Sequence, residues 1–119
     1  MPGSIDEINA IFEDLERCVF DVVNGVQDSK EIRAAAFERT EQLSKQLTAL
    51  LKGHELIPRY ILERLSHAGS ILQNEASHMR TNAEQQKTLQ MAAAIITTSN
   101  LIIGGECHND RRPGVPRII

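Results

Sequence analysis

Two stretches of the chain bring metal-capable side chains close together. Glu75 and His78 have the Glu-x-x-His spacing that dimetal sites in four-helix bundles take from each of two helices. The sequence has no second element of this kind, so we expect no dinuclear site. Another group of potential ligands lies near the C-terminus: Glu106, Cys107, His108 and Asp110. One short segment cannot supply the separated ligand pairs of a structural zinc site unless a second copy shares it. The sequence therefore predicts a polar turn here, and no metal or other cofactor.

No catalytic arrangement can be assigned to the sequence. It lacks a nucleophile elbow, a phosphate-cradling glycine loop and a paired acid and base. Cys18 falls within an apolar helical pattern, where a small core residue is expected rather than a nucleophile. Cys18 and Cys107 form no Cys-x-x-Cys pair and indicate reduced thiols. We expect no catalytic residues and no enzymatic activity.

In length, acidity and helical periodicity the chain resembles histidine phosphotransfer domains, which are four-helix bundles. The resemblance implies a phosphoryl carrier with an exposed histidine, and His67 and His78 are the two candidates. That family places a lysine and a glycine shortly after the histidine. His67 is followed by Ala-Gly-Ser-Ile-Leu, and His78 by Met-Arg-Thr-Asn, so neither has the motif. A phosphotransfer-like role is therefore the weakest of the possible functions.

Composition narrows the class of partner. The chain has 119 residues, a formal net charge of -3, 3% aromatic residues and no tryptophan. An acidic chain with few aromatic rings lacks the basic surface and the stacking platforms of nucleic-acid binders, so we expect no nucleic-acid partner. The N-terminal segment is polar and acidic and does not resemble a signal peptide. The most apolar run, residues 89–103, is too polar in its middle to span a bilayer. We expect a cytoplasmic protein without membrane contact.

Four helical segments account for residues 1–105. Capping boxes formed by Ser4 with Glu7 and by Thr81 with Glu84 predict where the first and last helices begin. The first should end at Asn24-Gly25, the second should cover residues 29–52, the third residues 57–80, and the fourth should end at Ile103. Four segments of about 20 residues with short connections predict an all-α, up-down-up-down antiparallel four-helix bundle. Residues 106–119 follow Gly104-Gly105 and contain Pro113, Gly114 and Pro116, so we expect them to form a non-helical C-terminal tail.

The fourth helix is apolar on two sides. At 100° per residue, one side carries Leu89, Ala92, Ala93, Ile96, Asn100 and Ile103, and we expect this side to face the core. The other side carries Met91, Ala94, Ile95, Thr98 and Ile102. A second apolar stripe needs a cover, which a second copy of the chain or the tail would provide. We therefore predict a homodimer interface made by this second stripe, with tail anchors at Val115, Ile118 and Ile119.

The third helix has an inner face made of apolar residues at helical spacing: Ile61, Leu65, Ala68, Leu72, Ala76 and Met79. Gly69, flanked by small residues, indicates a close crossing with another helix. The sequence is most typical of a small cytosolic interaction or regulatory protein that forms a homodimer and contacts a further, unidentified protein. The alternative is a bundle that binds a small apolar ligand near Gly69, Thr97 and Asn100, where small and polar residues interrupt the packing.

Overall fold

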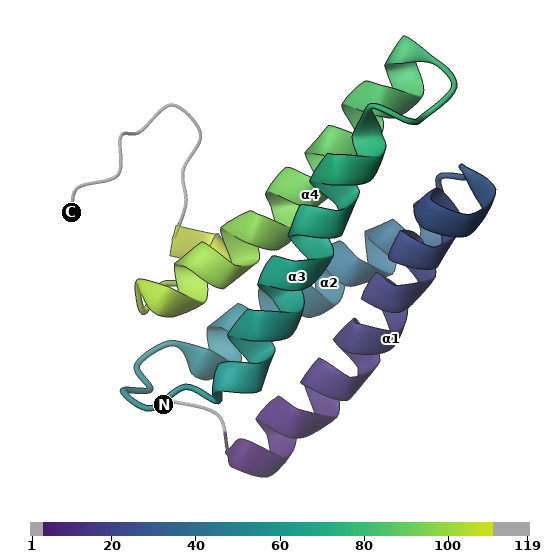
Figure 1. The fold of residues 1–119 in the computed structure, drawn as a ribbon. Helices are drawn as coiled ribbons and strands as arrows, with labels where there is room; N and C mark the ends of the chain where they lie inside the picture. Colours follow the sequence, from purple (N-terminus) through teal and green to yellow (C-terminus); the bar gives the residue numbers. More distant parts are fainter. Residues whose placement is uncertain (1–3, 111–119) are drawn as a thin grey trace.

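The computed structural model describes residues 4–110 as four α-helices and a short 3-10 turn. The elements are α1 (Ile5–Ser29), α2 (Ala34–Leu51), α3 (Arg59–Ala76), α4 (Asn82–Ile103) and η1 (His108–Asp110), drawn in Figure 1. These residues contain no strand, so the predicted all-α four-helix bundle is confirmed. The predicted tail anchors Val115, Ile118 and Ile119 lie outside the described residues.

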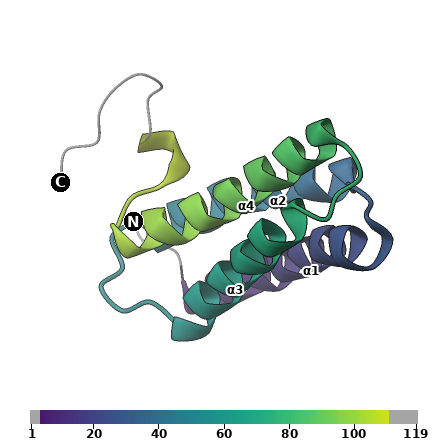
Figure 2. The ribbon, with the colours of Figure 1, turned by 45° about the horizontal axis from the view of Figure 1, so that its top comes forward.

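The bundle is built from two antiparallel helical hairpins. α1 packs on α2, and α3 packs on α4; the hairpins meet through α1 beside α3 and α2 beside α4. Figures 1 and 2 show α1 and α3 running in one direction and α2 and α4 in the other. α2 and α3 follow each other in sequence but lie diagonally across the bundle, so the connection between them crosses one of its ends. Parallel helices α1 and α3 therefore become neighbours on one face.

Both predicted capping boxes are present. The Ser4 hydroxyl accepts from the Glu7 N–H at 3.2 Å, and the Glu7 carboxylate accepts from the Ser4 N–H at 3.3 Å. The same exchange links Thr81 and Glu84, with both distances 3.1 Å. Each box satisfies amide groups that a helix start leaves without an intrahelical acceptor. The predicted starts of the first and fourth helices are confirmed.

Three other helix boundaries were predicted wrongly. α1 continues through Gly25 to Ser29 and ends at Lys30, whose φ is 52°. Gly25 does not stop the helix but makes room for the returning chain, because a Cβ atom there would lie 2.9 Å from the Glu31 carbonyl oxygen and 2.9 Å from the Arg33 Cγ. α1 therefore includes residue 29, at which the second helix was predicted to begin. α2 begins instead at Ala34, and no side chain caps its first turn. α3 likewise ends at Ala76, four residues before the predicted position.

The core contains one apolar face from each helix. All six residues predicted for the inner face of α3 are buried, including Met79, which lies in the turn after the helix. Buried threonines are interspersed with them, and their hydroxyls bond to backbone carbonyls of their own helix: Thr40 to Ala36 at 2.8 Å, Thr88 to Glu84 at 2.8 Å and Thr98 to Ala94 at 3.1 Å. A threonine that satisfies its hydroxyl in this way can be buried at little cost.

The predicted orientation of α4 was wrong. Met91, Ile95, Thr98 and Ile102 are at most 3% exposed and Ala94 is half-buried, whereas Leu89 is 42% and Ile103 67% exposed. Ala93 and Asn100 are also exposed, while Ala92 from the predicted inner side is buried and Ile96 is half-buried. Each side of α4 carries a polar residue, and these two residues explain the orientation. Thr98 can be buried because its hydroxyl bonds to a carbonyl of its own helix. Asn100 stays outside because its amide needs donors and acceptors that an apolar core lacks. Within residues 4–110, no helix has the length and apolarity needed to cross a membrane.

Candidate interaction surfaces

The outer face of α4 is the first candidate surface. We define it by its exposed or half-buried residues Leu89, Ala93, Ile96, Thr97, Asn100 and Ile103. The sequence contains no charged residue from Thr88 to Gly105, so this face is uncharged along most of the helix. The residues predicted for the homodimer interface, Met91, Ala94, Ile95, Thr98 and Ile102, instead face the chain's own core. The side of α4 that still needs a cover is therefore the one predicted to lie inside, except for Ala92, which is buried.

Gly69 marks the crossing of α3 and α4, as its small neighbours indicated. A Cβ atom at this position would lie 2.6 Å from Cγ1 and 3.1 Å from Cδ1 of Ile96. The Ile96 side chain thus occupies the space that the predicted ligand site would need. Thr97 is half-buried and Asn100 is exposed, and none of these three candidate ligand-binding residues lines the apolar groove between α1 and α3.

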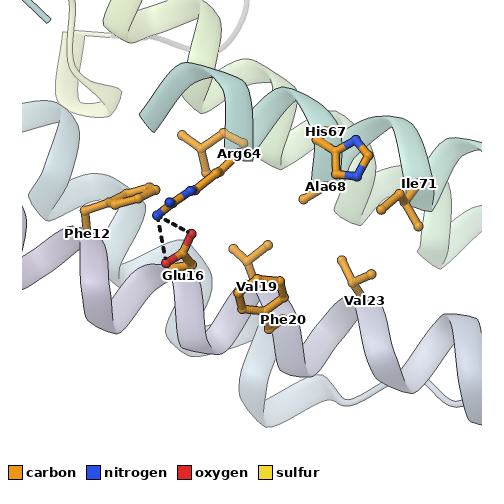
Figure 3. Close-up of a pocket in the computed structure, with 10 residues that line it drawn as sticks. Phe12, Glu16, Val19, Phe20, Val23, Arg64, His67, Ala68 and Ile71 are labelled. Atoms are coloured by element: carbon orange, nitrogen blue, oxygen red, sulfur yellow. Dashed lines mark hydrogen bonds and ion pairs between the residues drawn. The ribbon is translucent and has the colours of Figure 1, made fainter. Parts of the chain in front are cut away.

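This groove, of about 340 Å³, lies between the parallel helices α1 and α3, as Figure 3 shows. We call it the α1/α3 groove. Its walls are mostly apolar and comprise Phe12, Val19, Phe20 and Val23 from α1 and Leu65, Ala68 and Ile71 from α3. Three polar side chains, Glu16, Arg64 and His67, complete the lining. The volume is within the range of small-molecule and peptide-anchor pockets.

One end of the α1/α3 groove is closed by an ion pair supported by aromatic rings. Arg64 Nη1 lies 2.9 Å from Glu16 Oε2 and donates a 3.2 Å hydrogen bond to Oε1. The Arg64 guanidinium also lies 5.2 Å from the centre of the Tyr60 ring, which meets Phe12 edge-on with centroids 5.5 Å apart. The Tyr60 hydroxyl donates to Asn9. These contacts link α1 to α3 at their N-terminal halves.

A second ion pair links the C-terminal ends of the same two helices. Lys30 Nζ lies 2.8 Å from Glu75 Oε2, one turn beyond Ile71. The hydrogen bond from Lys30 lowers the pKa of Glu75 below its ordinary value. Polar contacts thus hold α1 against α3 on both sides of the apolar stretch, and small Ala68 leaves the middle open.

Glu16 is not fully satisfied by its partner. The contact between Arg64 and Glu16 Oε2 is an ion pair without hydrogen-bond geometry, and Oε2 is buried without a hydrogen-bond donor among the described residues. The positive charge of Arg64, 2.9 Å away, nevertheless compensates the charge of this oxygen.

The segment after α4 returns onto the bundle between α2 and α4. The His108 N–H donates to the Thr48 hydroxyl at 3.2 Å, and His108 Nε2 lies 3.0 Å from the Thr98 hydroxyl. Lys52 Nζ lies 2.7 Å from Asp110 Oδ1, and this hydrogen bond, with that from the Cys107 N–H, lowers the pKa of Asp110 to about 2. Two of the four predicted metal-capable residues, His108 and Asp110, therefore make contacts that hold this turn against the bundle. Among residues 4–110, no three such side chains lie close enough to hold a metal ion.

The remaining candidate residues are separate from one another. His67 and His78 are exposed, with His67 on the rim of the α1/α3 groove. Cys18 is half-buried, and its burial raises the pKa of the thiol, which disfavours the reactive thiolate. Sequence reasoning missed the groove and its exposed aromatic, Phe20. The helical spacing of Phe12, Phe20 and Val23 was the available signal, because it places three apolar residues on one strip of α1, interrupted by Glu16.

Comparisons with protein-family models, with curated proteins and with solved structures find no match to this chain. The outer face of α4 and the α1/α3 groove therefore carry what can be inferred about function.

Proposed function

We propose that this protein is a small interaction or regulatory module that forms a homodimer through the outer face of α4. One observation carries the proposal: this face is exposed, carries Leu89 and Ile103, and has no charge between Thr88 and Gly105. Depletion of charge at the centre of a surface is what distinguishes protein interfaces from ordinary surface. A further protein partner, bound at a different surface, belongs to the proposal.

Close packing of two α4 helices is favoured by the small residues in the middle of the face. Ala93 and Thr97 would let two helix backbones approach closely around a two-fold axis, with Leu89 and Ile103 at either side. Asn100 would find a polar partner in its symmetry mate, as buried asparagines do in coiled-coil interfaces. The two free cysteines, Cys18 and Cys107, suit the reducing conditions of a cytoplasmic protein.

The proposal is tested by placing a charge in the centre of the face. We expect the wild-type chain to sediment as a dimer at micromolar concentration and Ala93→Glu to sediment as a monomer with unchanged helical content. Ala35→Glu is the matched control, because Ala35 is also an exposed helical alanine but lies on α2. A wild-type chain that remains monomeric across the micromolar range, or a dimer that tolerates Ala93→Glu, contradicts the proposal.

A further inference from the structure

The α1/α3 groove is a gap between two well-packed hairpins. All four helices contribute to one apolar core, and ion pairs at Arg64 and at Glu75 also link α1 to α3. Between these pairs the groove is lined by apolar side chains, most of which are buried, while Ile71 is half-buried and Phe20 on the rim is 58% exposed. A large aromatic side chain in water at the edge of an apolar groove is typical of a binding surface.

The dimensions of the groove suit a helix. Arg64 and Glu75 are eleven positions apart in α3, which corresponds to about 16 Å of helix, or three turns. A partner helix of that length presents apolar side chains at i, i+3 or i+4, and i+7 to one side, which is the usual pattern of groove recognition. A small apolar ligand fits less well, because such sites enclose most of the ligand surface. Both rims of this groove are exposed, at Phe20 and at His67.

The charges around the groove favour a basic occupant. Its two cations, Arg64 and Lys30, are already paired with Glu16 and Glu75. Glu13 lies seven residues before Phe20 on the same flank of α1, and Glu63 lies four residues before His67 on the corresponding flank of α3. Both carboxylates are exposed and make no ion pair with residues 4–110.

The same charges disfavour a second copy in the groove. A two-fold contact between two grooves would bring four such carboxylates to one interface, while the cations beside them, Arg64 and Lys30, are already paired. A partner with Lys or Arg at its edges would pair with Glu13 and Glu63.

We propose that the α1/α3 groove binds one amphipathic helix of a partner protein. The aliphatic side chains of this helix lie against Phe20, Val23 and Ile71, and its Lys or Arg side chains face Glu13 and Glu63. The site is separate from the outer face of α4, so both surfaces can be occupied in the same molecule.

A random peptide library displayed on phage tests the proposal with the full-length protein as target and Phe20→Ser as counter-target. Phe20 is exposed, so its replacement leaves the core intact, which circular dichroism and thermal unfolding verify. We expect the selected peptides to share apolar residues at i, i+3 or i+4, and i+7 and to be rich in Lys and Arg. The dissociation constant of a selected peptide, measured by fluorescence anisotropy, should rise at least tenfold in Phe20→Ser.

Charge reversal provides the second arm. The double substitution Glu13→Lys/Glu63→Lys should weaken the same peptide about tenfold and reduce the salt dependence of its binding. Glu38→Lys/Glu55→Lys is the control with the same net charge, because these exposed residues lie on α2 and in the α2–α3 connection. Its affinity should stay within about twofold of wild type. Ala93→Glu should bind the peptide normally, which separates this site from the dimer proposal.

Three results would overturn the inference. Peptides recovered equally on wild type and Phe20→Ser would show that the groove does not select them. Selected peptides that are acidic, or that lack helical spacing, would show that the occupant has another chemistry. A change of oligomeric state in Phe20→Ser would show that a second copy fills the groove.

Discussion

Gly69→Ala is the substitution that most directly tests how α3 and α4 cross. An alanine in the interior of a helix is favoured over glycine by about 1 kcal/mol. Here the added Cβ would lie 2.6 Å from Ile96 Cγ1 and 3.1 Å from Cδ1, both closer than an ordinary carbon contact. Overpacking of this kind costs about 1–3 kcal/mol. We therefore expect Gly69→Ala to lower the free energy of unfolding by about 0–2 kcal/mol.

The effect should change sign when Ile96 is shortened. In an Ile96→Ala background both crowding atoms are gone, and the next neighbour of the new Cβ is the Ala92 carbonyl oxygen at 3.6 Å, an ordinary contact. Gly69→Ala should then raise the free energy of unfolding by about 1 kcal/mol. The coupling energy is the difference between the effects of Gly69→Ala on the free energy of unfolding in the two backgrounds, about 1–3 kcal/mol.

The four chains of this double-mutant cycle are compared by urea unfolding followed with far-UV circular dichroism. Ser70→Ala is the control, because Ser70 is the next residue of α3 and is exposed. It should change stability by at most about 0.5 kcal/mol, and equally in both backgrounds. If Gly69→Ala stabilises the wild-type and Ile96→Ala chains alike, Ile96 does not lie over Gly69.

Two further predictions concern the start of α4 and the turn that follows it. Thr81→Ala removes the acceptor that receives the Glu84 N–H at 3.1 Å, and thermal unfolding should show a loss of about 1 kcal/mol, whereas an unchanged melting temperature would mean that the box adds nothing. The pKa of Asp110 is lowered from 3.8 to about 2, so the stabilisation that its carboxylate contributes is complete above pH 4 and is lost as the pH falls through about 2. The Cys107 amide donates to Asp110 at 3.0 Å, so its NMR chemical shift should follow the titration of Asp110. Asp110→Ala should abolish this pH dependence. If the shift still titrates in Asp110→Ala, another group is responsible for the titration.

Local sequence patterns were sufficient to predict that four helices form, but not to predict where every helix begins and ends. Ser4 with Glu7 and Thr81 with Glu84 predicted two starts correctly, because a capping box involves only residues within one turn. Asn24-Gly25 has the composition of a helix end, yet α1 continues through it. The glycine is needed because Glu31 and Arg33 pack against it, and no local pattern reveals that contact.

The candidate surfaces depended still more on the tertiary structure. The α1/α3 groove joins residues that lie up to 59 positions apart, from Phe12 to Ile71, and it exists because the two hairpins place α1 beside α3. An up-down bundle with α2 beside α3 would satisfy the same apolar seams. The sequence contained the exposed Phe20 and the small Ala68 but not the fact that they share a groove.

The amino-acid sequence by itself determined four amphipathic or apolar helices, their all-α bundle, the apolar inner face of α3 and its close crossing at Gly69. Periodicity and capping are local properties, and a glycine among small residues marks a crossing wherever it occurs. Only the tertiary structure decided which side of α4 is buried. Both sides are apolar enough to face the core, and the choice depends on polar groups in the packed interior, where Thr98 is satisfied by its own helix and Asn100 would not be.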